Sequence, residues 1–151
     1  MIKFRDAVID DCDLIFKWSN DPVSREQSFS SEPIPYQAHK EWFKKKLQDP
    51  GSHLLIFHQD NEEVGLIRLD KTGDEWIISV NLEKKFRGMG LAVRMIEIAT
   101  EHILQQDLKS IAAFIKPDNI ASIKVFQKAG YKKTDQNLYN GHLAYKYVYN
   151  K

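Results

Sequence analysis

The stretch that decides the fold runs from Asp74 to Thr100 and reads DEWIISVNLEKKFRGMGLAVRMIEIAT. Its first part, from Trp76 to Val80, is rich in β-branched and aromatic residues and predicts a strand. A cationic turn with two glycines, Gly88 and Gly90, follows, and apolar residues then recur at helical spacing. The stretch therefore predicts a strand, a basic glycine turn and the start of a helix.

Such a turn is suited to binding phosphate oxygens. A helix N-terminus exposes N–H groups without internal partners and carries a partial positive charge, and the glycines let the backbone approach a ligand. The dinucleotide-binding fingerprint is incomplete, because Val93 stands where its third glycine would be, and the Gly-Lys-Ser/Thr of the other phosphate loop is absent. We interpret the turn as a pyrophosphate cradle of another kind.

Two blocks of the sequence resemble a known family. The segment KKFRGMGLA, with Lys85, Gly88 and Gly90 in register, looks like the acetyl-coenzyme A signature of the GNAT (Gcn5-related) N-acetyltransferases, although Lys85 replaces the usual Arg or Gln. Downstream, PDNIASIKVFQKAGYKK at residues 117–133 is similar to the family's second conserved block. The resemblance extends from about Ile2 to Tyr147.

The resemblance implies a fold and an activity. We expect one GNAT-type domain over residues 1–151, of the α/β (α+β) class, with a mixed, mostly antiparallel twisted sheet of about six to seven strands flanked by about four helices. The length agrees with a single domain. The implied activity is N-acetyl transfer to a primary amine, with acetyl-coenzyme A as co-substrate and no metal.

Hydrophobic periodicity and turn residues predict the elements. An opening strand covers residues 2–9, and a helix reaches about Asn20. The polar segment 22–35 lacks the periodicity of a long element and is interpreted as a binding loop or lid. The remaining predictions are a helix at 36–48, a three-strand meander at 53–60, 63–71 and 75–82, a helix at 91–106, a strand at 110–115, a helix at 119–130, and strands at 131–134 and 142–149.

The resemblance also implies the coenzyme site. Backbone N–H groups of the glycine turn would bind the pyrophosphate, Lys84 or Lys124 the ribose phosphate, and the strand backbone at Val80 the pantetheine arm. Asn119 would contact the arm from the other side, or simply cap a helix. The implied residues are Val80, Leu82, Lys85, Arg87, Gly88, Met89, Gly90, Leu91, Ala92, Asn119, Lys124 and Phe126.

Catalysis requires a base, because an alkyl ammonium has a pKa of about 10 and must lose its proton before it attacks a thioester. Glu75, Asp70 and His39 are the candidates, acting directly or through a water. Many members of the family carry a tyrosine as general acid where this chain has Phe126. Solvent could then protonate the departing thiolate, and Tyr131 and Tyr139 are substitutes. We expect the enzyme to work mainly by positioning its two substrates.

The first half of the chain bears on the acceptor. Asn-Asp-Pro after the first helix, an aromatic-bearing loop and His-x-x-Trp-Phe look like the N-terminal half of GNAT members that acetylate amino groups on nucleotide-linked deoxysugars of the pseudaminic type. On that resemblance a cation, Arg25, Arg68 or Lys71, would face the nucleotide's phosphates. The acceptor site would be lined by Asn20, Arg25, Phe29, His39, Trp42, Arg68 and Lys71.

Three other functions fit the same sequence. One is acetylation of a protein N-terminus, as in the ribosomal-protein acetyltransferases, whose first helix and loop are similar. Another is acetylation of an aminoglycoside, which would favour an acidic acceptor pocket, whereas the loop carries Arg25 near Lys40. The third is a noncatalytic module that binds acyl-coenzyme A, an alternative that the missing tyrosine keeps open.

Composition bears on partners and compartment. Twenty-two basic and 21 acidic residues nearly cancel, which argues against a nucleic-acid surface and favours a small-molecule partner. The single cysteine, Cys12, fits a reducing compartment. There is no apolar run of about 20 residues, and the segment MIKFRDAV lacks the apolar core of a signal peptide. We therefore expect a cytoplasmic protein without a membrane partner, and the family adds a homodimer as an expectation.

Overall fold

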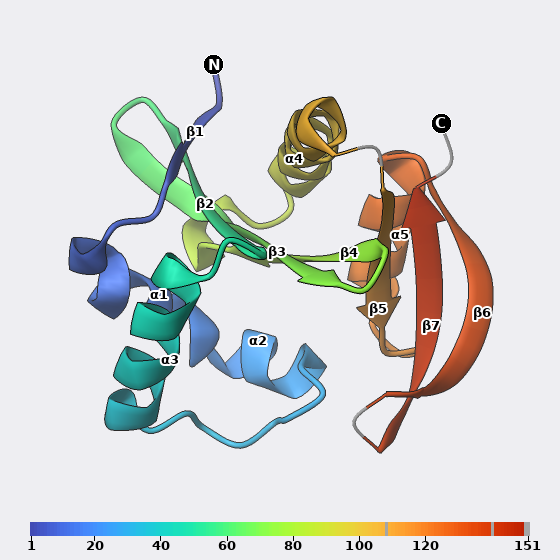
Figure 1. Cartoon of the computed structure of the whole chain (residues 1–151), viewed down its shortest axis with the longest axis horizontal. Coiled ribbons are helices and arrows are strands. Elements are labelled where there is room, and N and C mark those ends of the chain that lie inside the picture. The colour runs from blue at the N-terminus through green and yellow to red at the C-terminus, as the bar shows by residue number, and fades with distance from the viewer. Residues whose placement is uncertain (108, 140, 150–151) are drawn as a thin grey trace.

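One seven-stranded sheet organises the molecule (Figure 1). The computed structural model describes residues 1–107, 109–139 and 141–149. The strand order is β1-β2-β3-β4-β5-β7-β6, and every neighbouring pair is antiparallel except β4 and β5, which are parallel. The strands are β1 (Lys3–Asp6), β2 (Ser52–Gln59), β3 (Glu62–Thr72), β4 (Glu75–Leu82), β5 (Ser110–Ile115), β6 (Tyr131–Tyr139) and β7 (His142–Tyr149).

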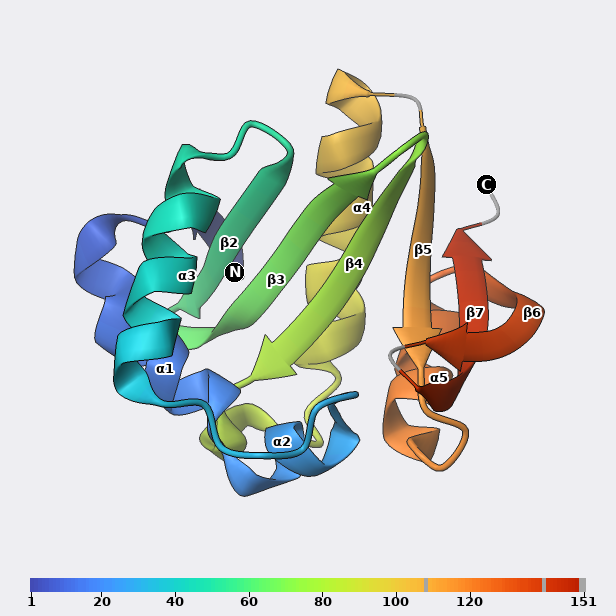
Figure 2. The same cartoon turned by 60° about the horizontal axis from the view of Figure 1, so that its bottom comes forward.

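Helices cover both faces of the sheet. The α-helices are α1 (Cys12–Ser19), α2 (Pro22–Gln27), α3 (Tyr36–Gln48), α4 (Leu91–Gln106) and α5 (Ile120–Lys128), and short 3-10 turns lie at Ile9–Asp11 and Lys84–Phe86. In Figure 2, α1 and α3 lie in front of the strands, and α4 lies behind them. The expected mixed, mostly antiparallel sheet with flanking helices is confirmed, and the described residues form one α-helix more than the four or so expected.

The alternation of side chains along the strands explains this layering. On one face, Trp76 and Ile78 of β4 join the larger hydrophobic core with Met95 and Ile96 of α4. On the other face, Leu54, Ile56 and Leu66 form a smaller core against α1 and α3. Residues that belong to these cores are almost fully buried, so both helical layers are fixed by apolar burial.

The parallel strands β4 and β5 separate part-way along their length. They pair only where residues 75–77 face residues 110–112, whereas on its other edge β5 pairs with β7 over residues 112–115. Figure 2 shows the two strands meeting at one end and diverging toward the other, with α2 lying near the wide end. The C-terminal part of β4 therefore has a strand on one side only.

Three expectations about elements need correction. The opening strand stops at Asp6, because the Asp11 carboxylate accepts a hydrogen bond from the Val8 N–H (2.8 Å) and two from Arg5 (2.8 and 2.9 Å), which turns the chain into the 3-10 helix. Segment 22–35 contains a six-residue helix, α2, that we did not expect. The strand expected at 131–134 extends to Tyr139, because its pairing with β7 continues to His142.

Candidate active site

The glycine turn presents an open backbone next to the start of α4. Gly88 and Gly90 have φ of 78° and 77°, a left-handed conformation that favours glycine, and a Cβ built on either would meet nothing within 4 Å. Gly90 is the N-cap of the 16-residue helix α4, and no described side chain caps that helix. Its first N–H groups and its positive dipole end thus face the turn, which fits the binding of a pyrophosphate.

The C-terminal part of β4 offers hydrogen-bonding groups along its free edge. The Glu83 N–H donates to the Val64 carbonyl of β3 (2.7 Å). Since backbone groups alternate in direction along a strand, the N–H and C=O groups of Val80 and Leu82 point away from β3, into the separation between β4 and β5. An extended, amide-rich chain could pair with them as an added strand.

On the other side of this separation, the second sequence block serves mainly to pack. Asn119 caps α5 by accepting a hydrogen bond from the Ser122 N–H (3.2 Å). Phe126 is 3% exposed and lies edge-on to Tyr131, so the structure does not bring its side chain to the surface of the separation. Lys124 is exposed on α5.

Neither tyrosine suggested as a substitute acid lies free on the coenzyme side. Tyr131 is 1% exposed, and its hydroxyl is hydrogen-bonded to Thr100 Oγ1 (2.7 Å). Burial raises its pKa, so it is a poor proton donor near neutral pH. Tyr139 stacks on Phe114 of β5, with ring centroids 4.6 Å apart.

Two basic residues of the turn, Arg87 and Lys85, are already paired with carboxylates. Arg87 Nη2 donates to Asp21 Oδ2 (2.7 Å), and the Arg87 side chain is 28% exposed. Lys85 forms an ion pair with Glu62, and its side chain is 65% exposed. Arg87 is thus held at the turn, whereas Lys85 lies largely in solvent, where an ion pair contributes little.

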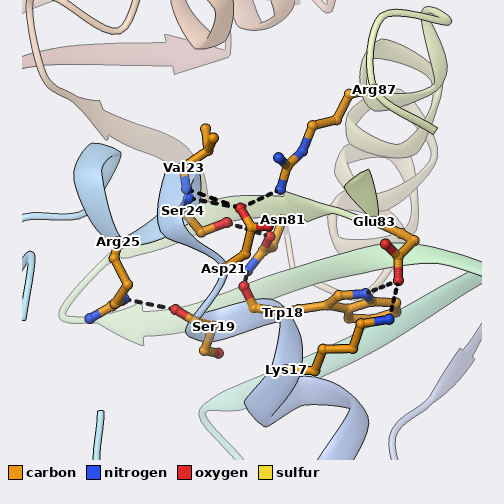
Figure 3. A network of polar contacts seen from close by, with 10 residues as sticks. All are labelled: Lys17, Trp18, Ser19, Asp21, Val23, Ser24, Arg25, Asn81, Glu83 and Arg87. Atoms are coloured by element: carbon orange, nitrogen blue, oxygen red, sulfur yellow. Dashed lines mark hydrogen bonds and ion pairs between the residues drawn. The ribbon is translucent and has the colours of Figure 1, made fainter. Parts of the chain in front are cut away.

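Helix α2 is tied to elements on both sides of the separation. Ser24 Oγ donates to Asn81 Oδ1 near the end of β4 (2.9 Å), and Lys116 Nζ, just after β5, donates to the Glu26 carbonyl (3.1 Å). Figure 3 shows Asp21, Ser24, Asn81 and Arg87 in one network. Asp21, Ser24 and Asn81 were not among the predicted site residues, although Asp-Pro is a recognisable helix start.

Asn20 and Arg25 hold the segment that follows α2. The Asn20 amide donates to the Ile34 carbonyl (2.9 Å) and accepts from the Ile34 N–H (2.7 Å). Arg25 donates to the carbonyls of Ser19 (2.7 Å), Ser30 (2.8 Å) and Glu32 (3.1 Å). Burial and then the charge of Arg68 lower the pKa of Arg25. Both residues therefore shape the segment from within.

Arg68, Asp70 and Glu75 share the sheet face that carries α1 and α3. The Arg68 guanidinium lies over the Trp42 ring, 5.4 Å from its centroid, and Arg68 is in register with exposed Ser79 of β4. The Glu75 carboxylate forms an ion pair with Lys146 of β7 (3.0 Å). Phe114 neighbours Lys146 across the strands, so this face combines aromatic rings with charges of both signs.

Asp70 is held as a carboxylate by two hydrogen-bond donors and by the charge of a neighbouring guanidinium. Lys46 Nζ (2.8 Å) and Ser52 Oγ (2.7 Å) donate to it, and Arg68 Nε lies 3.1 Å away. Burial alone would raise the pKa of Asp70, but these hydrogen bonds and charges outweigh it, and the pKa is lowered. A lowered pKa makes Asp70 a weaker base than an unpaired carboxylate.

Three predicted residues lie off the sheet face that carries α1 and α3, or at its edge. His39 is 2% exposed between α1 and α3, with Nε2 2.9 Å from the Cys12 carbonyl oxygen, and burial lowers its pKa, so its contacts are those of a packing residue. Lys71 points to the opposite face of the sheet, where it pairs with Asp107 (2.9 Å). Phe29 packs edge-on against Tyr139.

Comparison with known families follows from this geometry. The chain matches the model of the acetyltransferase (GNAT) domain over residues 2–132. It belongs to the GNAT acetyltransferases. The expected enzyme class, N-acetyltransferase, is therefore confirmed.

Relatives of this acetyltransferase include characterised proteins. It is 26% identical over 128 residues to acetyltransferase PseH of Campylobacter jejuni, covering 83% of this chain and 79% of PseH. Among solved structures, aminoglycoside acetyltransferase AAC(6')-Ib with ribostamycin and coenzyme A superposes with a TM-score of 0.86 at 17% identity, covering 99% of this chain and 93% of that one. A domain from Methanocaldococcus jannaschii reaches 0.86 at 22% identity, covering 100% and 99%.

A third solved structure adds a different acceptor. Spermidine N-acetyltransferase from Vibrio cholerae, in complex with coenzyme A and spermine, superposes with a TM-score of 0.83 at 15% identity, covering 97% of this chain and 92% of that one. At these identities the likeness concerns the fold. Within the described part of the acetyltransferase, no helix is long and apolar enough to cross a membrane.

Proposed function

We propose that this acetyltransferase transfers acetyl from acetyl-coenzyme A to a primary amine of a nucleotide-linked deoxysugar, by direct transfer. The observation that supports binding of acetyl-coenzyme A is the open glycine turn, with Gly88 and Gly90 in left-handed conformations at the start of α4, where no side chain of the described residues caps the helix. The backbone N–H groups of residues 88–92 are the pyrophosphate donors, and the free edge at Val80 and Leu82 pairs with the pantetheine arm.

The chemistry needs little from the chain beyond position and proton transfer. Acetyl-coenzyme A supplies a thioester: a C–N bond forms, the C–S bond breaks, and the acceptor amine releases a proton. We propose that Glu75 receives that proton through a water, because its carboxylate is on the open sheet face and the residues that pair with it, Lys146 and Ser110, leave it partly exposed. Asp70 is the second choice, because its two hydrogen-bond donors and the charge of Arg68 lower its basicity.

The acceptor proposal rests on the first half of the chain and on charge. The resemblance of residues 18–50 to nucleotide-sugar acetyltransferases and the similarity to PseH support it. Arg68 stacks over Trp42 with 41% of its side chain exposed, which offers a guanidinium for a phosphate beside an aromatic ring for a base or sugar.

Charge also separates this acceptor from those of the structural neighbours. Aminoglycosides and polyamines are polycations, which bind best to an acidic surface. Here the face carries Arg68, Lys46 and Lys146 beside the two carboxylates Asp70 and Glu75, and both carboxylates are already paired with cations. An acceptor with anionic groups fits this face better than a polycation.

The experiment is release of free coenzyme A from acetyl-coenzyme A with a panel of acceptors: amino-deoxysugar nucleotides, ribosomal-protein N-terminal peptides and aminoglycosides. We expect turnover on the sugar nucleotides alone. Glu75→Gln should then lower kcat about 100-fold with coenzyme binding unchanged, Asp70→Asn should have a smaller effect, and His39→Ala should mainly lower stability. If no sugar nucleotide turns over while acetyl-coenzyme A still binds, the proposed acceptor is wrong.

A further inference from the structure

One carboxylate oxygen of Asp21 joins two elements that are far apart in the sequence. Asp21 Oδ2 accepts hydrogen bonds from the Val23 N–H (3.1 Å) and the Ser24 N–H (3.2 Å), and so caps α2. The same oxygen accepts from Arg87 Nη2 (2.7 Å), the residue directly before Gly88 (Figure 3). The first turn of α2 and the residue before the glycine turn therefore share one acceptor atom.

Helix α2 connects this contact to the segment that follows it, residues 28–35, which we call the acceptor-side segment. Through Ser24 it is bonded to Asn81 of β4, and through the Glu26 carbonyl to Lys116 beyond β5. Arg25 of the same helix binds the carbonyls of Ser30 and Glu32 in the following segment. A helix of six residues has little stability of its own, so its position depends on these external contacts.

The Arg87–Asp21 ion pair is partly shielded from solvent, and Arg87 keeps further N–H donors that do not bind Asp21. The side chains of Arg87 and Asp21 are 28% and 18% exposed, so salt screens them less than a surface pair. Burial alone would raise the pKa of Asp21, but the hydrogen bonds and charge of Arg87 and the two N–H groups outweigh it and lower the pKa. A guanidinium has five N–H donors, so the pairing with Asp21 leaves others for an anion at the turn.

We propose that Asp21 is a positioning residue that couples the coenzyme turn to α2, so that coenzyme binding at the turn orders α2 and the acceptor-side segment up to residue 35. The inference rests on the proposed function, in which the turn binds the coenzyme's pyrophosphate. An anion at the turn fixes Arg87, Arg87 fixes the Asp21 carboxylate, and the carboxylate fixes the start of α2. By linkage, a bound acceptor then strengthens coenzyme binding by the same factor.

Hydrogen–deuterium exchange with coenzyme A as the probe tests this coupling in the full chain. In the unsubstituted protein we expect coenzyme A to slow amide exchange both at residues 88–94 and in α2, the latter about fivefold or more, the lower range of coupling between sites. Asp21→Asn keeps an oxygen that caps the helix but removes the charge that pairs with Arg87. It should abolish the slowing in α2 and retain it at residues 88–94.

Asp13→Asn is the matched control. Asp13 is an α1 carboxylate that accepts a hydrogen bond from the hydroxyl of Tyr36, the residue just after the acceptor-side segment (2.7 Å). Asp13→Asn therefore removes one negative charge, as Asp21→Asn does, but leaves the contact with Arg87 intact. The slowing of exchange in α2 should persist. Asp21→Ser, also a good cap, replaces Asp21→Asn if thermal melting shows the latter to be unfolded.

Two results overturn the coupling alone: slowing in α2 that survives in Asp21→Asn, or slowing in the unsubstituted protein that is confined to residues 88–94. Absence of slowing at residues 88–94 in the unsubstituted protein has a different meaning, because it removes the coenzyme site itself and the proposed function with it. The exchange at the turn therefore separates the two failures.

Discussion

Gly90 and Gly73 have similar backbone conformations in different surroundings. Gly90 has φ of 77° and begins α4, whereas Gly73 has φ of 62° in the turn between β3 and β4. A Cβ on either would meet nothing within 4 Å. Alanine at either site should therefore cost about 1 kcal/mol of stability through its left-handed backbone alone.

Only one of the two substitutions should affect the coenzyme. In Gly90→Ala the new methyl group stands on the backbone that we propose to contact the pyrophosphate, so the dissociation constant of coenzyme A should rise about tenfold or more. Gly73→Ala should leave it unchanged. Isothermal titration calorimetry with coenzyme A, alongside urea unfolding, measures both quantities. Equal affinities in the two variants would remove the turn from the coenzyme site.

Residues that act together with their neighbours in the sequence could be predicted from the sequence. The glycines and the basic residues of the turn follow from the helix-start pattern. Asp21 does not, because its partner Arg87 is 66 positions away in sequence and only the fold brings them together. His39 carried a usable signal: it shares a helical face with Phe43, and the two rings stack in the structure, so burial was the simpler interpretation.

At the scale of elements, sequence patterns fixed the long helices and missed the short one. The helices predicted at 36–48 and 91–106 have those bounds in the structure, because each presents an apolar face to one of the two cores. Helix α2 has six residues and none of them is buried, so no periodicity marks it. Its formation depends on the Asp21 cap and on contacts with distant strands.

The segment after α2 depends on Arg25, whose guanidinium binds three backbone carbonyls. Arg25→Met keeps much of the aliphatic stem and removes all three bonds. We expect limited proteolysis to cut within residues 28–35 about tenfold faster, while the KM for acetyl-coenzyme A stays within twofold and the acceptor KM rises. The hydrophobic cores lie elsewhere, so the melting temperature should fall by only a few degrees.

Arg25→Lys distinguishes a scaffold from a charge. A lysine retains the positive charge but has one donor nitrogen, which cannot reproduce a guanidinium bound to three carbonyls. The lysine variant should therefore behave like Arg25→Met toward protease. Recovery of the acceptor KM in the lysine variant, with proteolysis still fast, would instead assign Arg25 to direct contact with an acceptor anion.

At the scale of the whole molecule, strand order was not readable from periodicity. The sequence indicates where strands lie, but it does not show that β5 pairs with β4 only at residues 110–112 and with β7, some 30 positions later, on its other edge. The shortness of the pairing between β4 and β5 leaves the C-terminal edge of β4 free. The resemblance to the GNAT family supplied what local patterns lack, since a family signature carries information about the complete topology.

The response of the whole fold to pH follows from two histidines, His39, which is buried, and His53, which is half-buried. Burial lowers the pKa of His39 and of His53, and for His53 it outweighs the charge of Asp6, which acts in the opposite direction. As the pH falls, the two histidines therefore bind protons in the unfolded chain before they do so in the folded protein. The free energy of unfolding should be level above about pH 7 and decrease as the pH falls below the unfolded histidine value of about 6.5. Each neutral histidine contributes at most about 1.4 kcal/mol per pH unit.

A second decrease should begin below about pH 4. The pKa values of Asp11, Asp21 and Asp70 are lowered in the folded state, so their contributions are present above the unfolded carboxyl value and are lost as the pH falls through the folded ones. Urea unfolding from pH 8 to pH 3 resolves the two stages. In a His39→Gln, His53→Gln double variant the first stage should flatten while the second remains; an unchanged slope between pH 7 and 5 would show that other groups cause it.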